Sequence, residues 1–195
     1  MSDETWIDPR RIAAVVYDDG VAVDSLLSVF AADLIAQGAR LGGVIQLPRS
    51  EPECGPHAPR QLRDLETGEA IPLCRTFAAQ GGKSCALDSA SLQRAAGRIA
   101  GASQRGADLL FLSRFGRQEA AGRGFSEALA VAMQRGRPVL TAVRRGLADN
   151  WLSAAGGVGT LLDARLWVLK DWWSGLGARP SGRVEGVCLK PDKLS

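Results

Sequence analysis

The sequence contains no apolar stretch long enough to cross a membrane, which takes about 20 consecutive apolar residues. It begins with the acidic segment Met1-Ser-Asp-Glu rather than the basic start of a signal peptide. Basic residues are scattered, with adjacent pairs only at Arg10-Arg11 and Arg144-Arg145, and aromatic residues are not interleaved with them as in nucleic-acid-binding sheets. We therefore expect a cytoplasmic protein that binds neither membranes nor nucleic acid.

Histidine is almost absent, since His57 is the only one in the chain and stands in the segment Cys54-Gly-Pro-His57. Four cysteines are present, and in a reducing cytoplasm they need an explanation other than disulfides. Two thiolates and two further donors could hold zinc in a tetrahedral site. The candidate ligands are Cys54, His57, Cys74 and Cys85. Their gaps lack the paired spacing of a zinc ribbon, and free cysteines are often buried in cores. Zinc binding and buried thiols therefore both stay open.

Neither sign of charge dominates, because 24 Lys and Arg residues oppose 21 Asp and Glu residues, a formal net charge of +3. Apolar residues make up 46% of the 195 positions, enough for a core that needs no disulfide or metal for its stability. The length predicts one domain over residues 1–195.

Short apolar runs alternate with helical periodicities, which predicts an α/β fold with a mainly parallel sheet and flanking helices. The first unit is a buried strand at 12–17, a helix capped by Asp24 or Ser25, and a strand at 41–46. Such a crossover makes its two strands parallel. The later predicted elements are a helix from Asp88-Ser89, a strand at 108–112, a helix from Phe125, a strand at 138–143, a helix at 150–155 and an edge strand from 161–162 and 166–169.

Residues 48–90 have a different character, because four prolines crowd between Pro48 and Pro59. The turn chemistry of Glu66-Thr-Gly-Glu69, between two short extended runs, predicts a hairpin. The segment 79–85 reads as irregular. We interpret 48–90 as an insertion within the domain that lies over the sheet.

The tryptophans give weaker signals. Trp151 and Trp167 suit positions in the core, whereas the adjacent pair Trp172-Trp173 cannot both face inward on a strand. One ring of that pair would then be exposed, and it could form a homodimer contact or cover the edge of the sheet.

The segment from Ala107 to Phe125 contains the best site candidates. Its apolar run at 109–112 is typical of a strand buried on both faces, and it ends abruptly in Ser113-Arg114. Ligands of open α/β sheets bind beyond the carboxyl ends of the strands. Arginines placed there could hold an oxyanion by charge-assisted hydrogen bonds, or simply tie a surface loop to its neighbours. The candidates in this segment are Ser113, Arg114, Arg117, Glu119 and Arg123.

The turn after the first strand has the length of a phosphate-binding loop but lacks its charges. Such a loop uses a Lys for the phosphate oxygens and a Ser or Thr hydroxyl for magnesium. Here Val23 stands in place of the Lys and Asp24 in place of the hydroxyl. An Asp at a helix start caps the helix but repels phosphate, so an ordinary capped turn and an anion site made by helix amides both stay open. The site would include Gly20, Val21, Asp24 and Ser25.

With both stretches in view, the chain resembles an uncharacterised bacterial family that is itself similar to the small P-loop nucleoside triphosphatases first known from thermophiles. The match rests on Asp108-Leu-Leu-Phe-Leu-Ser-Arg-Phe-Gly-Arg-Gln-Glu-Ala-Ala-Gly-Arg-Gly-Phe125, with support from Asp64-Leu65-x-x-Gly68. The resemblance implies a P-loop-type α/β fold and frequent association with molybdate-uptake genes, but no established activity. The triphosphatases place an Asp-Glu pair where Ser113-Arg114 stands, so their catalytic activity does not carry over.

Three functions follow from these patterns. The first is a catalytically degenerate P-loop-type protein that binds a small anionic ligand, either a nucleotide or an oxyanion such as molybdate, for sensing or handling. The second is a weak nucleoside triphosphatase, in which Glu119 would be catalytic. The third is a metal- or cluster-carrying protein that uses Cys54, His57, Cys74 and Cys85. We favour the first, because an Arg-rich strand end without a carboxylate pair suits anion binding better than metal-assisted hydrolysis.

Overall fold

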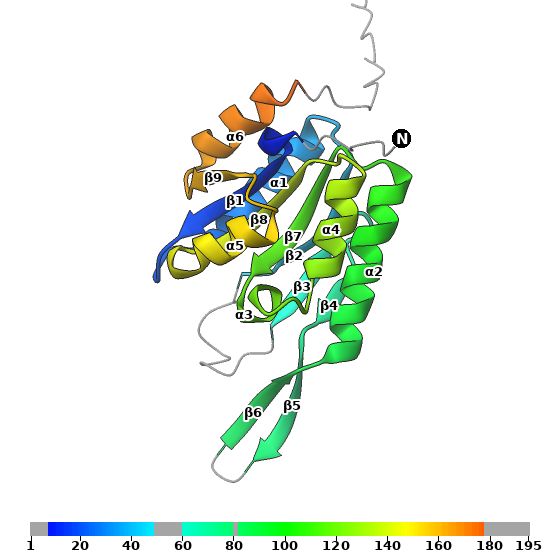
Figure 1. Ribbon diagram of the computed structural model, residues 1–195. Coiled ribbons are helices and arrows are strands. Elements are labelled where there is room, and N and C mark those ends of the chain that lie inside the picture. Colours follow the sequence, from blue (N-terminus) through cyan, green and yellow to red (C-terminus); the bar gives the residue numbers. More distant parts are fainter. Residues whose placement is uncertain (1–7, 49–59, 80–81, 178–195) are drawn as a thin grey trace, which may run out of the picture.

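The computed structural model describes residues 8–48, 60–79 and 82–177, and for 74–79 and 82–87 it describes the backbone path. A seven-stranded sheet runs through the protein in the order β4-β3-β2-β7-β8-β1-β9 (Figure 1). Its strands are β1 (Ile12–Tyr17), β2 (Leu41–Gln46), β3 (Gln61–Asp64), β4 (Ala70–Pro72), β7 (Leu109–Phe115), β8 (Val139–Arg144) and β9 (Thr160–Asp163). From β2 to β9 the neighbouring strands are parallel, whereas β3 and β4 are antiparallel to their neighbours.

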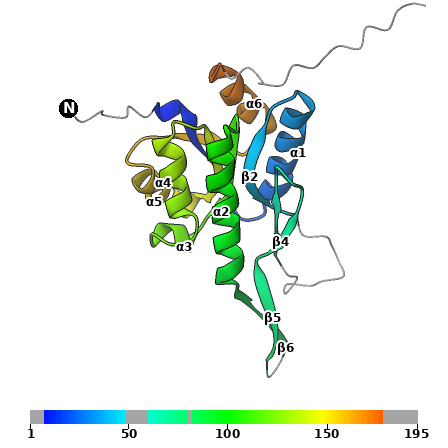
Figure 2. The same cartoon turned by 90° about the vertical axis from the view of Figure 1, so that its right-hand side faces the viewer.

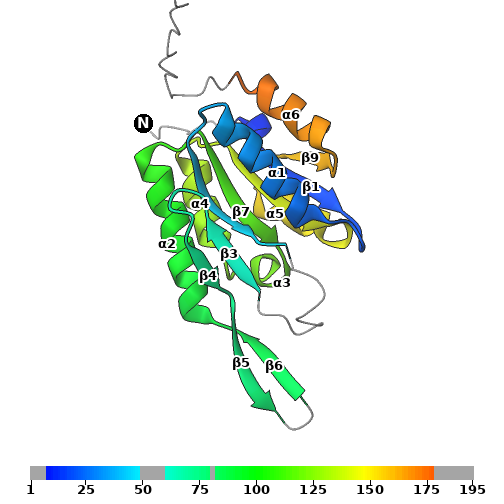
Figure 3. The same ribbon diagram turned by 180° about the vertical axis from the view of Figure 1, so that it is seen from behind.

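Helices cover both faces of this sheet, so that the described residues form three layers. The helices are α1 (Val23–Ala36), α2 (Ser89–Arg105), α3 (Arg117–Ala120), α4 (Ser126–Gln134), α5 (Ala148–Ala154) and α6 (Leu166–Gly175), with short 3₁₀ turns at Pro9–Arg11 and Arg145–Leu147. Figure 1 shows α2, α4 and α5 in front of the sheet, and Figure 3, the view from behind, shows α1 and α6 on the opposite face. None of the helices in the described ranges has the length and hydrophobicity that crossing a membrane requires.

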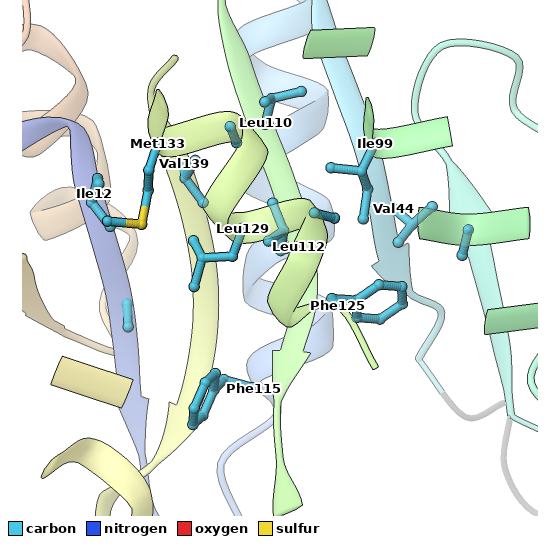
Figure 4. Packing of buried hydrophobic residues seen from close by; sticks show 14 of the residues in the cluster. Ile12, Val44, Ile99, Leu110, Leu112, Phe115, Phe125, Leu129, Met133 and Val139 are labelled. Atoms are coloured by element: carbon cyan, nitrogen blue, oxygen red, sulfur yellow. The ribbon is translucent and has the colours of Figure 1, made fainter. Parts of the chain in front are cut away.

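The central strands are apolar along their whole length because both of their faces are covered. Alternate residues enter opposite clusters: Ile12 and Leu110 pack beneath α2, α4 and α5 (Figure 4), while Ala13 and Phe111 pack beneath α1 and α6. This alternation follows the two-residue period of a strand. Gly42 allows α2 to lie close to β2, because a Cβ atom there would collide with the Cβ of Ala102.

The segment interpreted as an insertion extends the sheet instead of lying over it. The hairpin predicted around Glu66-Thr-Gly-Glu69 is present as β3 and β4, and β3 pairs with β2. Asp64 organises its turn, since Oδ1 accepts hydrogen bonds from the backbone N–H groups of Glu66 and Thr67. The interpretation that the insertion covers a face is therefore wrong for 61–72, because this hairpin satisfies the free edge of β2.

A second hairpin replaces the segment predicted to be irregular. Strands β5 (Cys74–Ala79) and β6 (Gly82–Leu87) pair with each other in a sheet of their own, and Figure 2 shows them projecting from the body below α2. Leu73 anchors this hairpin: its N–H donates to the carbonyl of Arg60, and its carbonyl accepts from the N–H of Asp88.

The end of the described chain also differs from the prediction. Strand β9 is the predicted edge strand, but residues 166–169 belong to helix α6. Leu169, Trp172 and Trp173 are all buried because they recur at helical spacing, i, i+3 and i+4. The expectation of an exposed ring in the Trp172-Trp173 pair is therefore wrong. Trp151 is fully buried as expected, whereas Trp167 is 64% exposed.

Candidate functional site

A β-bulge in β7 determines where Arg114 lies. Phe111 pairs with Leu140 and Arg114 with Ala142, so that two residues, Leu112 and Ser113, stand opposite Thr141. In a regular strand Arg114 would share the face of Leu112; the extra residue turns it to the opposite face, toward α1. At the bulge, the Thr141 hydroxyl donates a hydrogen bond to the carbonyl oxygen of Leu112 at 2.7 Å. Ser113 has a φ of 21°, the one positive φ of a non-glycine residue in the described ranges.

The turned guanidinium forms a forked ion pair with Asp24 at the start of α1. Arg114 Nε donates to Asp24 Oδ1 at 2.8 Å, and Nη2 donates to Oδ2 at 2.5 Å. Nη1 donates to the hydroxyl of Tyr17 at 3.3 Å, and the guanidinium lies 5.2 Å from the centre of that ring. Gln46 Nε2 donates to Asp24 Oδ2 at 3.0 Å. Burial alone would lower the pKa of Arg114, and it is the largest single effect. The hydrogen bonds to Asp24, the charge of Asp24 and the smaller contributions of Tyr17 together outweigh it, so that the pKa is raised.

The role predicted for Asp24 or Ser25 as a helix cap is wrong, because α1 begins at Val23, two residues earlier than a cap at Asp24 would give. Its N-cap is Ala22, and no side chain caps the helix. Asp24 is instead the second residue of the helix, where its carboxylate interacts favourably with the positive end of the helix dipole. Ser25 follows on the partly buried side of α1. Asp24 is thus free to accept from Arg114.

A cavity of about 440 Å³ opens beside this ion pair, at the carboxyl ends of the parallel strands. Its lining residues are Gly20, Val21, Ala22, Gln46, Arg60, Arg114 and Arg144. Three arginines therefore line one cavity, next to the uncapped start of α1. We call this space the arginine cavity. Its chemistry suits an anion, since both guanidinium groups and helix N-termini attract negative charge.

A second cavity, of about 350 Å³, shares the lining residue Arg144 with the arginine cavity. It is lined by Tyr17, Asp18, Asp19, Arg117, Arg144, Arg145, Gly146 and Leu147. Two ion pairs cross it: Arg144 Nη1 lies 2.5 Å from Asp19 Oδ1, and Arg145 Nη2 lies 2.9 Å from Asp18 Oδ2. Hydrogen bonds from Arg145 lower the pKa of Asp18, against a smaller opposing effect of desolvation.

Glu119 lies away from both cavities and supports the local backbone. Its Oε2 accepts from the N–H of Gly116 at 2.9 Å, at the start of α3, and its Oε1 accepts from the N–H of Phe125 at 3.2 Å, at the start of α4. Gly124, with a φ of 62°, lies so close to this carboxylate that a Cβ atom would collide with Oε1. Glu119 and Gly124 of the central motif thus have a structural explanation.

The remaining candidates are distributed over three places. Arg123 donates from Nε to Gln118 Oε1 at 2.9 Å and lines a groove of about 760 Å³ between α2 and α4. Arg117 lines the second cavity, and Ser113 is buried at the bulge. The structure therefore brings together Gly20, Val21 and Arg114, with Asp24 behind them.

Sequence reasoning missed three polar residues of the arginine cavity: Gln46, Arg60 and Arg144. A signal for Arg144 was available, because it follows the predicted strand at 138–143 just as Arg114 follows the strand at 108–112. Arg60 had no such signal, since it lies at the end of the Pro-rich segment and is brought to the cavity by the pairing of β3 with β2.

The side chains of the predicted zinc ligands lie outside the part of the chain that the structure describes. Cys54 and His57 lie outside the described ranges, and Cys74 and Cys85 pair in the backbone with Leu87 and Thr76 on the β5–β6 hairpin. Within the described ranges no three His, Cys, Asp or Glu side chains form a group that could hold a metal ion. Zinc binding stays a prediction.

Comparisons with known proteins agree on the fold. Molybdenum import ATP-binding protein ModC 2 of Bradyrhizobium diazoefficiens is 39% identical over 177 residues, which are 91% of this chain and 20% of that protein. The chain thus spans about a fifth of the length of this relative. The solution structure of a human cancer-related nucleoside triphosphatase is similar with a TM-score of 0.62 at 16% identity, covering 89% of this chain and 100% of that chain.

The predicted fold, an α/β fold of the P-loop nucleoside triphosphatase type with a mainly parallel sheet, is confirmed by this likeness. The resemblance found in the sequence is confirmed as well. The family described as "Protein of unknown function (DUF2478)" matches residues 12–172, and the chain belongs to this family.

Proposed function

We propose that this chain binds a small oxyanion, or the phosphate end of a nucleotide, in the arginine cavity, and that it senses or handles this ligand without hydrolysing it. The observation that supports the proposal most strongly is the convergence of Arg60, Arg114 and Arg144 on one space at the carboxyl ends of the strands. Guanidinium groups bind tetrahedral oxyanions by charge-assisted, often forked hydrogen bonds.

The same geometry argues against hydrolysis of a nucleoside triphosphate. A phosphate-binding loop needs a Lys for the β- and γ-phosphates and a hydroxyl for magnesium. Val23 is a fully buried apolar residue, and both carboxylate oxygens of Asp24 already accept hydrogen bonds from Arg114. Glu119, the catalytic candidate, is engaged by two backbone N–H groups. These residues do not fit a magnesium nucleotide held in the usual way.

The names of the similar proteins narrow the class of ligand. One is an ATP-binding protein of molybdenum import, and the other is a nucleoside triphosphatase. Molybdate and nucleotides are therefore the anions to test first. Molybdate is a tetrahedral dianion with four acceptor oxygens, and three converging guanidinium groups complement its charge and its hydrogen-bonding capacity.

Titration calorimetry with molybdate, phosphate and ATP, each with and without magnesium, tests the proposal. The informative variants are Arg60→Ala and Arg144→Ala, because both side chains are exposed and their loss should leave the fold intact. We expect each to weaken binding of the preferred anion about ten-fold, since a charge-assisted hydrogen bond contributes about 1.5 kcal/mol or more.

Arg145→Ala is the matched control. It removes the neighbouring guanidinium, whose side chain is 65% exposed compared with 56% for Arg144, and this residue lines only the second cavity. If the wild type binds none of the three ligands, the proposed function is refuted. Equal losses in all three variants would show that binding depends on overall charge and not on the arginine cavity.

A further inference from the structure

Arg144 is the one guanidinium of the arginine cavity that also lines the second cavity. Arg144 is the last residue of β8. Its partner Asp19 lines the second cavity but not the arginine cavity. The ion pair of 2.5 Å therefore engages Nη1 of an arginine that also lines the proposed ligand site. A carboxylate on this arginine uses donor groups that an anion in the arginine cavity would also require.

Asp18 provides a close comparison on the same turn. It forms a forked pair with Arg145, whose Nε and Nη2 donate to its carboxylate at 2.9 Å. Arg145 does not line the arginine cavity, so the Asp18 pair occupies no donor that the ligand needs. Two adjacent carboxylates thus bind two adjacent arginines, and only one pair competes with the ligand.

We propose that Asp19 is an internal competitor for Arg144 and sets the affinity of the arginine cavity for its anion. This inference rests on the proposed function, because it needs a ligand in that cavity. Binding of the ligand exchanges the Asp19 carboxylate on Arg144 for an oxyanion, and the turn at 18–20 is released from β8 on that side. Release of the ligand restores the pair.

The expected size of the effect follows from the exposure of the pair. The side chains of Arg144 and Asp19 are 56% and 78% exposed, so water screens their attraction. Exposed pairs of this kind are weak, and removing the competitor should raise the affinity for the anion about two- to five-fold. The turn itself remains attached through the second pair, Asp18 with Arg145.

Calorimetric titration of molybdate and phosphate into the full chain tests this inference. The variants are Asp19→Asn, which removes the competing charge at constant shape, and Asp18→Asn as its control. We expect Asp19→Asn to bind about two- to five-fold more tightly than the wild type, and Asp18→Asn to bind as the wild type does. In the background of Arg144→Ala, Asp19→Asn should have no effect on the affinity.

The outcomes separate the two proposals. If the wild type binds the anion and Asp19→Asn binds it with the same affinity, the proposal that Asp19 competes is overturned while the proposed function stays intact. An equal gain from Asp18→Asn, or a gain that persists without Arg144, also overturns it, because the effect would then be one of general charge. Absence of binding in every variant refutes the proposed function itself.

Discussion

The guanidinium of Arg114 and the carboxylate of Asp24 join two parts of the chain that are 90 positions apart. Arg114 stands near the end of β7 and Asp24 in the first turn of α1, and their side chains are 30% and 10% exposed. In the usual phosphate-binding loop the first turn of this helix carries a magnesium-binding hydroxyl. Here an ion pair within the protein occupies that position, which is why we expect anion binding without magnesium.

The ion pair should be strongly coupled. Asp24→Asn and Arg114→Met each leave one partner largely buried without its counter-charge, and we expect each to lower the free energy of unfolding by about 2–3 kcal/mol. The double variant should lose less than the sum of the two, with a coupling energy of about 1–2 kcal/mol. Urea denaturation of the four proteins measures this cycle, and strictly additive losses would contradict the coupling.

Glu119 should contribute to stability and not to catalysis. Glu119→Ala removes the acceptor of two backbone N–H groups, and we expect it to lower the free energy of unfolding by about 1–2 kcal/mol. Glu127→Ala, an exposed Glu in the first turn of α4, is the control and should change stability by about 0.5 kcal/mol or less. A loss of ATP turnover with unchanged stability would instead support the triphosphatase hypothesis.

The buried face of α6 should be essential for the fold. Trp173 is 5% exposed, and Trp173→Ala removes a large ring from the cluster beneath α1 and α6, which should cost about 3–5 kcal/mol. Trp167, on the same helix but 64% exposed, is the matched control, and Trp167→Ala should cost about 0.5 kcal/mol or less. Similar melting temperatures for the two variants would contradict the packing described for α6.

The pair of Asp18 and Arg145 should make stability depend on pH in the acidic range. The pKa of Asp18 is lower in the folded protein than its ordinary value of 3.8, chiefly because Arg145 donates hydrogen bonds to it. The contribution of this pair to the free energy of unfolding is therefore fully present when the pH is above the ordinary pKa of Asp18. It is lost as the pH falls through the lower pKa that Asp18 has in the folded protein. The difference in melting temperature between the wild type and Asp18→Asn should be largest near neutral pH and vanish in strong acid. A difference that grows on acidification would contradict this sign.

The sheet was predictable because its strands carry continuous apolar runs with sharp ends. Strands β1, β2 and β8 lie within one residue of their predicted positions, since burial on both faces leaves few alternatives for such runs. Residues 166–169 were assigned wrongly, because a short apolar run fits a strand and a buried helix equally well. Only the burial of Leu169, Trp172 and Trp173 together reveals the helical period.

The candidate site was predictable only in part, for a geometric reason. The position of Arg114 near a strand end was apparent, but the bulge opposite Thr141 that turns it toward Asp24 was not. A one-residue bulge reverses the face of every following residue, and no local pattern in the sequence marks it. Glu119 and Arg123 belong to the same motif as Arg114, yet neither lines the arginine cavity. Arg123 lines the groove between α2 and α4, and Glu119 accepts hydrogen bonds from two backbone N–H groups.

The most direct measurement of the central claim is the magnesium dependence of ligand binding. Molybdate and ATP would be titrated into the wild-type protein by calorimetry, once with excess magnesium and once with a chelator, while product formation from ATP is followed in parallel. Because Arg114 engages both oxygens of Asp24, we predict that an anion binds with the same affinity in both conditions and that ATP stays intact. Binding that requires magnesium, or magnesium-dependent hydrolysis above a buffer blank, would contradict the account.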